Sequence, residues 1–262
     1  MPTVFLSIAL VAYIVGIFLA GLGTFTRIEL TRAGASIVFF VAWFAHLGAV
    51  VQRGRIIGQF PLSNLGEYLL FLGLAVMTLH LLLWIRWRVH VVGIVLPPVA
   101  AAAGFGALAV LTSGVAPVEN RPRGWFLFHT TVSTLGMATL IVALAMSLIY
   151  LFQDRALKSR RTLRLLERLP SLDRCDHIGF QSLTTGFVLL SLGIVAGFVV
   201  NEVVHGQFWV PGVKQYLALL AWIVFAGVLS ARVKLGFRGR KSAYLTITGV
   251  LLGLLTVAGM TL

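Results

Sequence analysis

The chain has 262 residues, of which 59% are hydrophobic and only 11% are charged. A soluble domain needs far more charge on its surface, so this composition excludes an ordinary globular protein and indicates an integral membrane protein. The formal net charge is +13, but most of the Lys and Arg residues gather in a few loops. That distribution is typical of membrane orientation and argues against nucleic acid as a partner.

Long apolar runs in lipid form helices, because a helix satisfies its own backbone polar groups within one segment. Eight runs of roughly 18–25 residues are long enough to cross a hydrocarbon core. We therefore predict an all-α integral membrane protein with eight transmembrane helices, forming a single transmembrane domain over residues 1–262. The predicted spans cover residues about 3–23, 34–52, 65–86, 89–113, 126–153, 179–201, 214–232 and 243–261.

Two details refine these spans. The first predicted span lacks a basic start and a clear small-residue cleavage site, so we expect it to be a retained helix and not a signal peptide. Pro97 and Pro98 lie inside the fourth span, and proline removes a backbone donor and clashes with the preceding turn. We expect the fourth helix to bend or break there.

The basic residues set the predicted orientation. Most of them fall within residues 27–32, 86–88, 155–174 and 232–241, which are loops on one side of an eight-span chain. By the positive-inside rule, these loops face the cytoplasm and both termini lie outside. The same basic inner loops are expected to attract anionic lipid. Cys175, the single cysteine, can form neither an internal disulfide nor a metal cluster alone.

Six short patterns then occur in order along the chain. They are His46 with Pro61-Leu62-Ser63-Asn64-Leu65-Gly66-Glu67; Phe128-His129; Ser147-Leu148-Ile149-Tyr150-Leu151 with Leu157-Lys158; Leu172-Asp173 with His177; Gly186-Phe187 with Gly193-Ile194-Val195-Ala196-Gly197; and Arg232, Gly236 and Arg238-Gly239-Arg240-Lys241. Together they resemble the CcsA/CcmC cytochrome c assembly family over residues about 37–262. Its eight-span HemX-like and YpjD-like branches are the most similar in size.

A tryptophan-rich loop of that family also has a counterpart here. Aligned without gaps, the chain keeps Gly206, Trp209, Lys214, Ala218, Leu219 and Trp222, and Phe208 stands for a tyrosine. It departs from the family pattern at His205, Pro211, Gly212 and Gln215, which stand for Trp, Trp, Asp and Glu. A later intramembrane histidine of the family is Ser230 here, and the last span carries no histidine.

The resemblance implies a function in cytochrome c biogenesis. Family members receive haem in the membrane, hold it at an outer surface and present it to apocytochrome c, usually beside a subunit of the CcsB/ResB type. For this chain it implies a multi-pass protein of the bacterial inner membrane, with the haem loop facing the periplasm.

The resemblance also implies a set of haem-binding residues. His129 and His205 would bind the haem iron, since neutral histidine supplies an axial nitrogen. Broad aromatic surface suits the haem plane and cations suit its propionates. The remaining candidates are Trp209, Trp125, Phe208, Lys214, Arg123 and, within the second span, His46, with Arg121 beside them.

Each candidate also has a structural interpretation. Trp125 fits an interfacial belt, His129 an interfacial histidine that caps polar groups, and His46 a hydrogen bond between helices. Glu67 fits either a first helical turn, where the dipole favours acidic residues, or a bond to Asn64 or a neighbouring helix.

Three functions remain open from the sequence. The preferred one is a membrane component that binds or escorts haem near the outer face, and the alternative is a haem-free assembly or regulatory subunit. A transporter is the third, although the sequence shows no inverted repeat or paired intramembrane charges. No catalytic residue is predicted, because paired carboxylates, a Ser–His–Asp set and a Walker loop are all missing from the sequence. The sequence leaves open whether the chain is an enzyme and favours a non-enzymatic role, because it resembles a haem-ligation subunit but lacks much of its motif.

Overall fold

The computed structural model of the chain describes residues 2–26, 28–112, 123–159 and 169–258. This part of the chain is helical and contains no strand. Its elements are α1 (Pro2–Phe25), α2 (Glu29–Ile57), α3 (Leu65–Trp87), the 3₁₀ helix η1 (His90–Ile94), α4 (Leu96–Thr112), α5 (Arg123–Ser159), α7 (Leu172–His205), α8 (Val213–Leu235) and α9 (Arg240–Ala258).

Helix length and composition confirm the predicted membrane class. Seven helical segments in the described residues are long and apolar enough to cross a membrane, from Thr3–Thr24 through Val213–Leu235. The eighth predicted span coincides with α9, which has 19 residues. The chain is an all-α integral membrane protein whose helices follow the apolar runs of the sequence.

The fourth span is broken as the prolines predict. η1 ends at Ile94, and α4 begins at Leu96, one residue before Pro97. Both prolines therefore lie in the first turn of α4, where the missing backbone N–H has no intrahelical partner to lose. The predicted span 89–113 therefore contains two helices, η1 and α4.

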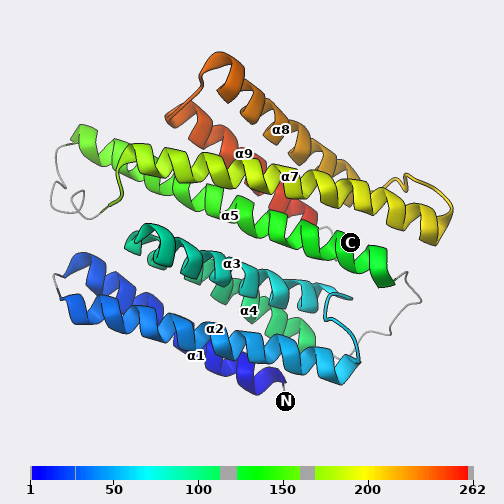
Figure 1. Cartoon of the computed structure of the whole chain (residues 1–262), viewed down its shortest axis with the longest axis horizontal. Coiled ribbons are helices and arrows are strands. Elements are labelled where there is room, and N and C mark those ends of the chain that lie inside the picture. Colours follow the sequence, from blue (N-terminus) through cyan, green and yellow to red (C-terminus); the bar gives the residue numbers. More distant parts are fainter. Residues whose placement is uncertain (1, 27, 113–122, 160–168, 259–262) are drawn as a thin grey trace. The chain divides into compact units, whose positions relative to one another are not determined.

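The chain divides into two compact units. The first contains α1–α4 and the second contains α5, α7, α8 and α9. In the first unit, successive helices reverse direction; α1 packs on α2 and α4, and α3 packs on the same two helices (Figure 1). Tyr13, Phe39, Leu70, Met77 and Leu96 are buried in its core. A single domain over residues 1–262 stays a prediction.

Polar contacts fix the first unit internally. Arg53 of α2 donates from Nε and Nη2 to Glu67 Oε1 of α3 at 2.9 and 2.8 Å, and both side chains are buried. The backbone N–H of Ser63 donates to Glu67 Oε2, and Asn64 caps α3 by accepting from the Glu67 N–H. Glu67 thus makes both bonds that its structural interpretation anticipates, one within its turn and one to a neighbouring helix.

The second unit is built on α5 and α7, which pack closely together, with α9 on α5 and α8 on both α7 and α9 (Figure 1). Its core contains Leu140, Leu183, Phe225 and Val250. Small residues permit the close approach, since a Cβ on Gly136 would lie 3.1 Å from the Leu190 backbone nitrogen.

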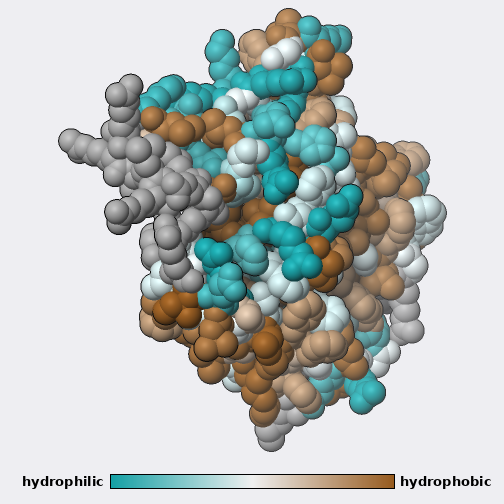
Figure 2. All heavy atoms as spheres, turned by 60° about the vertical axis from the view of Figure 1, so that its left-hand side comes forward, coloured by the Kyte–Doolittle hydropathy of each residue, from teal (hydrophilic) through white to brown (hydrophobic). Residues whose placement is uncertain are grey.

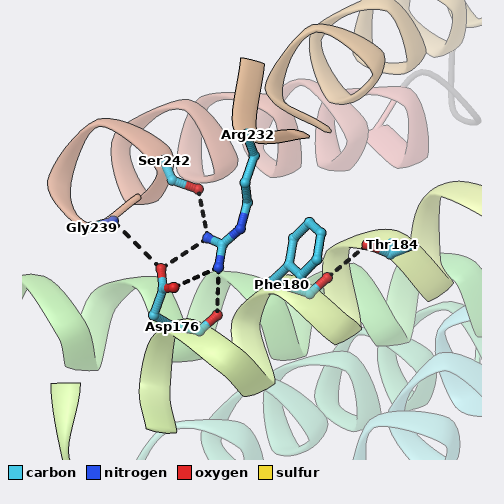
Figure 3. A network of polar contacts seen from close by, with 6 residues as sticks. All are labelled: Asp176, Phe180, Thr184, Arg232, Gly239 and Ser242. Atoms are coloured by element: carbon cyan, nitrogen blue, oxygen red, sulfur yellow. Dashed lines mark hydrogen bonds and ion pairs between the residues drawn. The ribbon is translucent and has the colours of Figure 1, made fainter. Parts of the chain in front are cut away.

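The α8–α9 turn of the second unit is held by ion pairs. Arg232 donates to both carboxylate oxygens of Asp176 on α7, and its guanidinium lies 4.2 Å from the Phe180 ring centroid (Figure 3). Arg240 pairs with Asp154 of α5. Arg232 and Arg240, which were predicted to attract anionic lipid, therefore pair with carboxylates and stabilise helix ends within the second unit. Much of the basic loop 155–174 lies outside the described residues.

The surface has the polarity of a membrane protein. Figure 2, which brings the left-hand side of Figure 1 forward, shows hydrophilic side chains gathered there and hydrophobic side chains along the flanks. Large exposed apolar residues occur along the described helices, for example Phe18, Phe44, Leu82, Val195 and Ile223. Apolar side chains exposed along a helix flank suit contact with lipid hydrocarbon.

Candidate functional site

A cavity of about 460 Å³ lies in the second unit, where α7 ends and α8 begins. Its walls come from α5, α7, the loop 206–212 and α8. This volume lies in the range of small-molecule sites, roughly 300–1,000 Å³. The cavity contains four of the predicted site residues, His129, His205, Trp209 and Lys214, and we name it the His129 cavity.

His129 is fixed by the backbone of α7. Its Nδ1 lies 2.7 Å from the carbonyl oxygen of Gly193. A carbonyl oxygen only accepts hydrogen bonds, so Nδ1 carries the proton and donates it. In the neutral imidazole this leaves the lone pair on Nε2. Metal-binding histidines use the same arrangement, in which one ring nitrogen donates to a carbonyl while the other binds the metal.

Gly197 makes room for the His129 ring. A Cβ added to Gly197 would lie 3.0 Å from Cε1 and 3.2 Å from Nδ1 of His129. One helical turn earlier, a Cβ on Gly193 would lie 2.3 Å from Ser133 Oγ. The two glycines therefore let α7 approach α5 closely enough for the imidazole to reach the Gly193 carbonyl.

Aromatic rings form part of the cavity wall. Phe126 of α5, Phe198 of α7 and Trp209 of the loop all line it. The Trp209 ring centroid lies 6.2 Å from that of Phe198 and 5.7 Å from that of Tyr216. These contacts hold the indole between α7 and α8, where it offers apolar surface to a bound ring system.

Polar and charged groups lie at the exposed part of the cavity. His205 is the last residue of α7, and Gly206 ends the helix with a left-handed φ of 66°. Lys214 stands in the first turn of α8, and both side chains are exposed. A cation and an imidazole thus lie at the exposed rim of the cavity, whereas the aromatic rings of its wall are half-buried.

The other predicted site residues lie elsewhere or are not described. Trp125 is 50% exposed and contacts Phe128, as an interfacial aromatic does, and Phe208 is 65% exposed; neither lines the cavity. Nothing is described of the Arg123 side chain, and Arg121 lies outside the described residues.

His46 belongs to the first unit and is fully buried. Its Nε2 donates to the Leu70 carbonyl and its Nδ1 accepts from the Tyr13 hydroxyl, each at 2.9 Å. These bonds join α1, α2 and α3, as the structural interpretation of His46 anticipates.

Two polar residues line the cavity that were not among the predicted haem-binding residues. Asn201 comes from the C-terminal end of α7, and Gln215 from the first turn of α8. A Cβ on Gly212 would lie 2.5 Å from Gln215 Oε1, so these two departures from the family loop fit one another. Spacing offered one signal: Ile194, Phe198, Asn201 and His205 recur every three or four residues, which places them on one face of α7.

Comparison with known proteins gives a family match over most of the chain. The model of the family described as "Cytochrome C assembly protein" matches residues 62–262. A cytochrome c biogenesis protein CcsA from Gloeothece citriformis is 31% identical over 242 residues, covering 73% of each chain. The CcsA protein from Guillardia theta is 28% identical over 211 residues, covering 73% of this chain and 70% of its own.

A solved structure shares the fold. Cytochrome c Heme Lyase CcmF superposes with a TM-score of 0.65 at 18% identity, covering 97% of this chain. The chain spans 46% of the length of that protein. This similarity concerns the fold.

Proposed function

The chain belongs to the cytochrome C assembly protein family, and we propose that it binds haem in the His129 cavity. It is a multi-pass membrane component of cytochrome c biogenesis. Haem would be the molecule that the protein carries and not a resident cofactor. When bound, haem would supply an iron centre that accepts axial nitrogen ligands.

The observation that carries the proposal is the state of His129. Its Nδ1 is engaged by the Gly193 carbonyl at 2.7 Å, which assigns the lone pair to Nε2 in the neutral ring. His129 also lines the cavity. A histidine whose tautomer and ring orientation are already fixed loses little freedom on binding a metal, so its arrangement favours ligation.

The remaining lining residues fit the chemistry of haem. Trp209, Phe198 and Phe126 offer aromatic surface to a macrocycle. Lys214 would attract a propionate carboxylate. His205 is the candidate for the second axial position, since it is the other histidine that lines this cavity.

Orientation, location and partners complete the proposal. The His129 cavity would face the outside of the bacterial inner membrane, with both termini on the same side, as the basic loops indicate. The chain would function as one domain whose family-like region covers residues about 37–262. A membrane partner of the CcsB/ResB type would work beside it, because the relatives are cytochrome c biogenesis proteins and family members usually pair with such a subunit.

A haem titration of the purified full-length protein tests the proposal. We expect a saturable Soret band for the native protein. His129→Ala should weaken binding strongly and His205→Ala should weaken it less, because His205 is exposed and less constrained. His177→Ala is the matched control, since this histidine lies in the first turns of the same helix, at its other end. Circular dichroism would establish that each variant keeps its helices.

Two results of this titration would contradict the proposal. If the native protein gave no Soret band, or if His129→Ala bound haem as tightly as the native protein, His129 would not be the ligand. A protein that binds no haem yet co-purifies with a second membrane subunit would instead favour the haem-free assembly role.

A further inference from the structure

A second, smaller cavity lies in the first unit. It has a volume of about 20 Å³ and is lined by residues that include Arg32, Ser36, His80, Trp84 and His90. We name it the Trp84 pocket. It belongs to a different unit from the His129 cavity, so it is a separate site.

The pocket lies at one end of the helices of its unit. α1 ends at Phe25, α2 begins at Glu29, α3 ends at Trp87 and η1 begins at His90. These termini come together because successive helices reverse direction (Figure 1). Trp, Arg and His at a helix end are typical of the interface between hydrocarbon and lipid headgroups.

Two buried polar atoms point to a ligand. His80 Nδ1 and Trp84 Nε1 are both buried and have no hydrogen-bond partner among the described residues. His80 is 3% exposed, and its ring is held by the edge of Phe39 at a centroid distance of 5.0 Å. Burying a polar atom without a hydrogen-bond partner is unfavourable. Such a group in a native protein commonly binds a water or a small ligand.

The polar groups at the pocket identify the ligand class. The Trp84 indole N–H can only donate, so its partner must be an acceptor. Arg32 brings a positive charge, and its Nε donates to the Gly23 carbonyl at 2.8 Å. Arg88 adds a second charge 5.7 Å from the Trp84 ring centroid. Among the described residues that line the pocket, there is no Asp or Glu to neutralise this charge.

The volume sets how much of a ligand is enclosed. About 20 Å³ holds one water-sized atom, because a site needs roughly 10–15 Å³ for that. A whole phosphate is too large to enter, but one of its oxygens fits. The rest of the group would lie beside Arg32 and the exposed His90, where guanidinium binds phosphate well.

We propose that the Trp84 pocket binds a phosphate group, with one oxygen accepting from the Trp84 N–H and the charge balanced by Arg32. Phospholipid headgroups and free phosphate both supply this chemistry. The Trp84 pocket lies among helix ends that carry Trp and Arg. This position favours the lipid headgroup over free phosphate, since basic pockets between transmembrane helices bind anionic lipid headgroups.

Calorimetric titration of the full-length protein in neutral detergent tests the site. The probes are dihexanoyl phosphatidylglycerol, inorganic phosphate and dihexanoylglycerol, which has the same acyl chains without the phosphate. We expect saturable binding of phosphatidylglycerol or of inorganic phosphate, and none of dihexanoylglycerol. Binding of phosphatidylglycerol without competition from inorganic phosphate identifies the headgroup, and binding of inorganic phosphate identifies the free anion.

Two variants and a control make the test specific to this pocket. Trp84→Phe removes the N–H and keeps an aromatic ring, and should weaken binding at least about tenfold, the factor expected for one hydrogen bond to a charged group. Arg32→Gln should weaken binding of the phosphate probe similarly, and this variant provides the test if Trp84→Phe does not fold. Trp87→Phe removes an indole N–H outside the pocket and should change nothing. The site is disproved if no phosphate probe binds, if dihexanoylglycerol binds equally, or if Trp84→Phe and Arg32→Gln bind as the native protein does; the pocket then holds a water only.

Discussion

Hydrogen bonds determine whether the ring nitrogens of His46, His129 and His80 can bind a ligand. Both ring nitrogens of His46 are engaged, by Tyr13 and by Leu70, so no lone pair remains for a ligand. His129 has one nitrogen engaged, and its other nitrogen is suited to bind a metal. His80 Nδ1 has no hydrogen-bond partner among the described residues, and His80 lines the Trp84 pocket.

The fit between Gly197 and His129 gives the first prediction. Gly197→Ala should weaken haem binding by about 10- to 100-fold, the usual effect of disturbing a group that orients a metal ligand. The added methyl would lie 3.0 Å from His129 Cε1 and push the imidazole away from the Gly193 carbonyl. Haem titration measures the effect. Gly227→Ala is the control, since its added Cβ meets nothing within 4 Å; equal affinity in the two variants would contradict the prediction.

The buried ion pair in the first unit gives the second prediction. Glu67→Ala should lower the free energy of unfolding by about 3–5 kcal/mol, because Arg53 would keep a buried charge with no carboxylate. Replacing both residues with methionine should restore most of the loss, since no buried charge remains. Thermal unfolding in detergent measures both effects, and a double variant no more stable than Glu67→Ala would argue against this cause.

At the scale of helices, glycines determine how closely α8 packs on α9 and α9 on α5. A Cβ on Gly249 of α9 would lie 2.6 Å from Cε1 of Phe225, which is fully buried in α8. A Cβ on Gly253 would lie 3.1 Å from the terminal methyl of Met137 in α5. A core phenyl ring cannot move aside easily, whereas an unbranched Met side chain adapts.

This difference gives the third prediction. Gly249→Ala should destabilise the second unit by about 1–3 kcal/mol, the range for overpacking a core, while Gly253→Ala should cost clearly less. The two glycines stand one turn apart in the same helix, so helix propensity affects both variants alike. Unfolding midpoints compare them, and a larger loss for Gly253→Ala would show that ring packing is not the cause.

The sequence predicts the helices well but the site only in part. Apolar run length located the seven helices of the described residues that are long and apolar enough to cross a membrane, because lipid imposes that length, and Pro97 marked the break before α4. The loop pattern placed Trp209 and Lys214, which the structure brings beside His129 and His205. The bond from His129 to Gly193 could not be foreseen, since it joins residues 64 positions apart and depends on how α5 packs against α7. The pairing of Arg53 with Glu67 depends likewise on helix packing.

At the scale of the whole molecule, charge predicts the orientation. In each unit, basic residues gather around one group of helix ends, at residues 86–88 in the first and 232–241 in the second, and the positive-inside rule predicts that these ends face the cytoplasm. The cavity of the second unit lies at the opposite end of α7 and α8, beside Gly206 and Gly212. A haem site in that cavity would therefore face away from the cytoplasm.

Orientation gives the fourth prediction. Gln207→Cys, in the loop between α7 and α8, and Lys234→Cys, in the last turn of α8, place exposed thiols at opposite sides of the unit's helix ends, on a Cys175→Ser background. A membrane-impermeant maleimide should label Gln207→Cys in intact cells and Lys234→Cys only after the cells are permeabilised. Labelling of Lys234→Cys in intact cells, with protection of Gln207→Cys, would reverse the proposed topology.

Chemical rescue of His129 is the measurement that tests haem ligation most directly. His129→Gly removes the imidazole and leaves its space, so the haem spectrum of the purified variant should be lost or altered. Added imidazole should restore the spectrum of the native protein, because a free ring can occupy the vacated position beside the Gly193 carbonyl. An unaltered spectrum in His129→Gly, or one that imidazole leaves unchanged, would contradict His129 as the axial ligand.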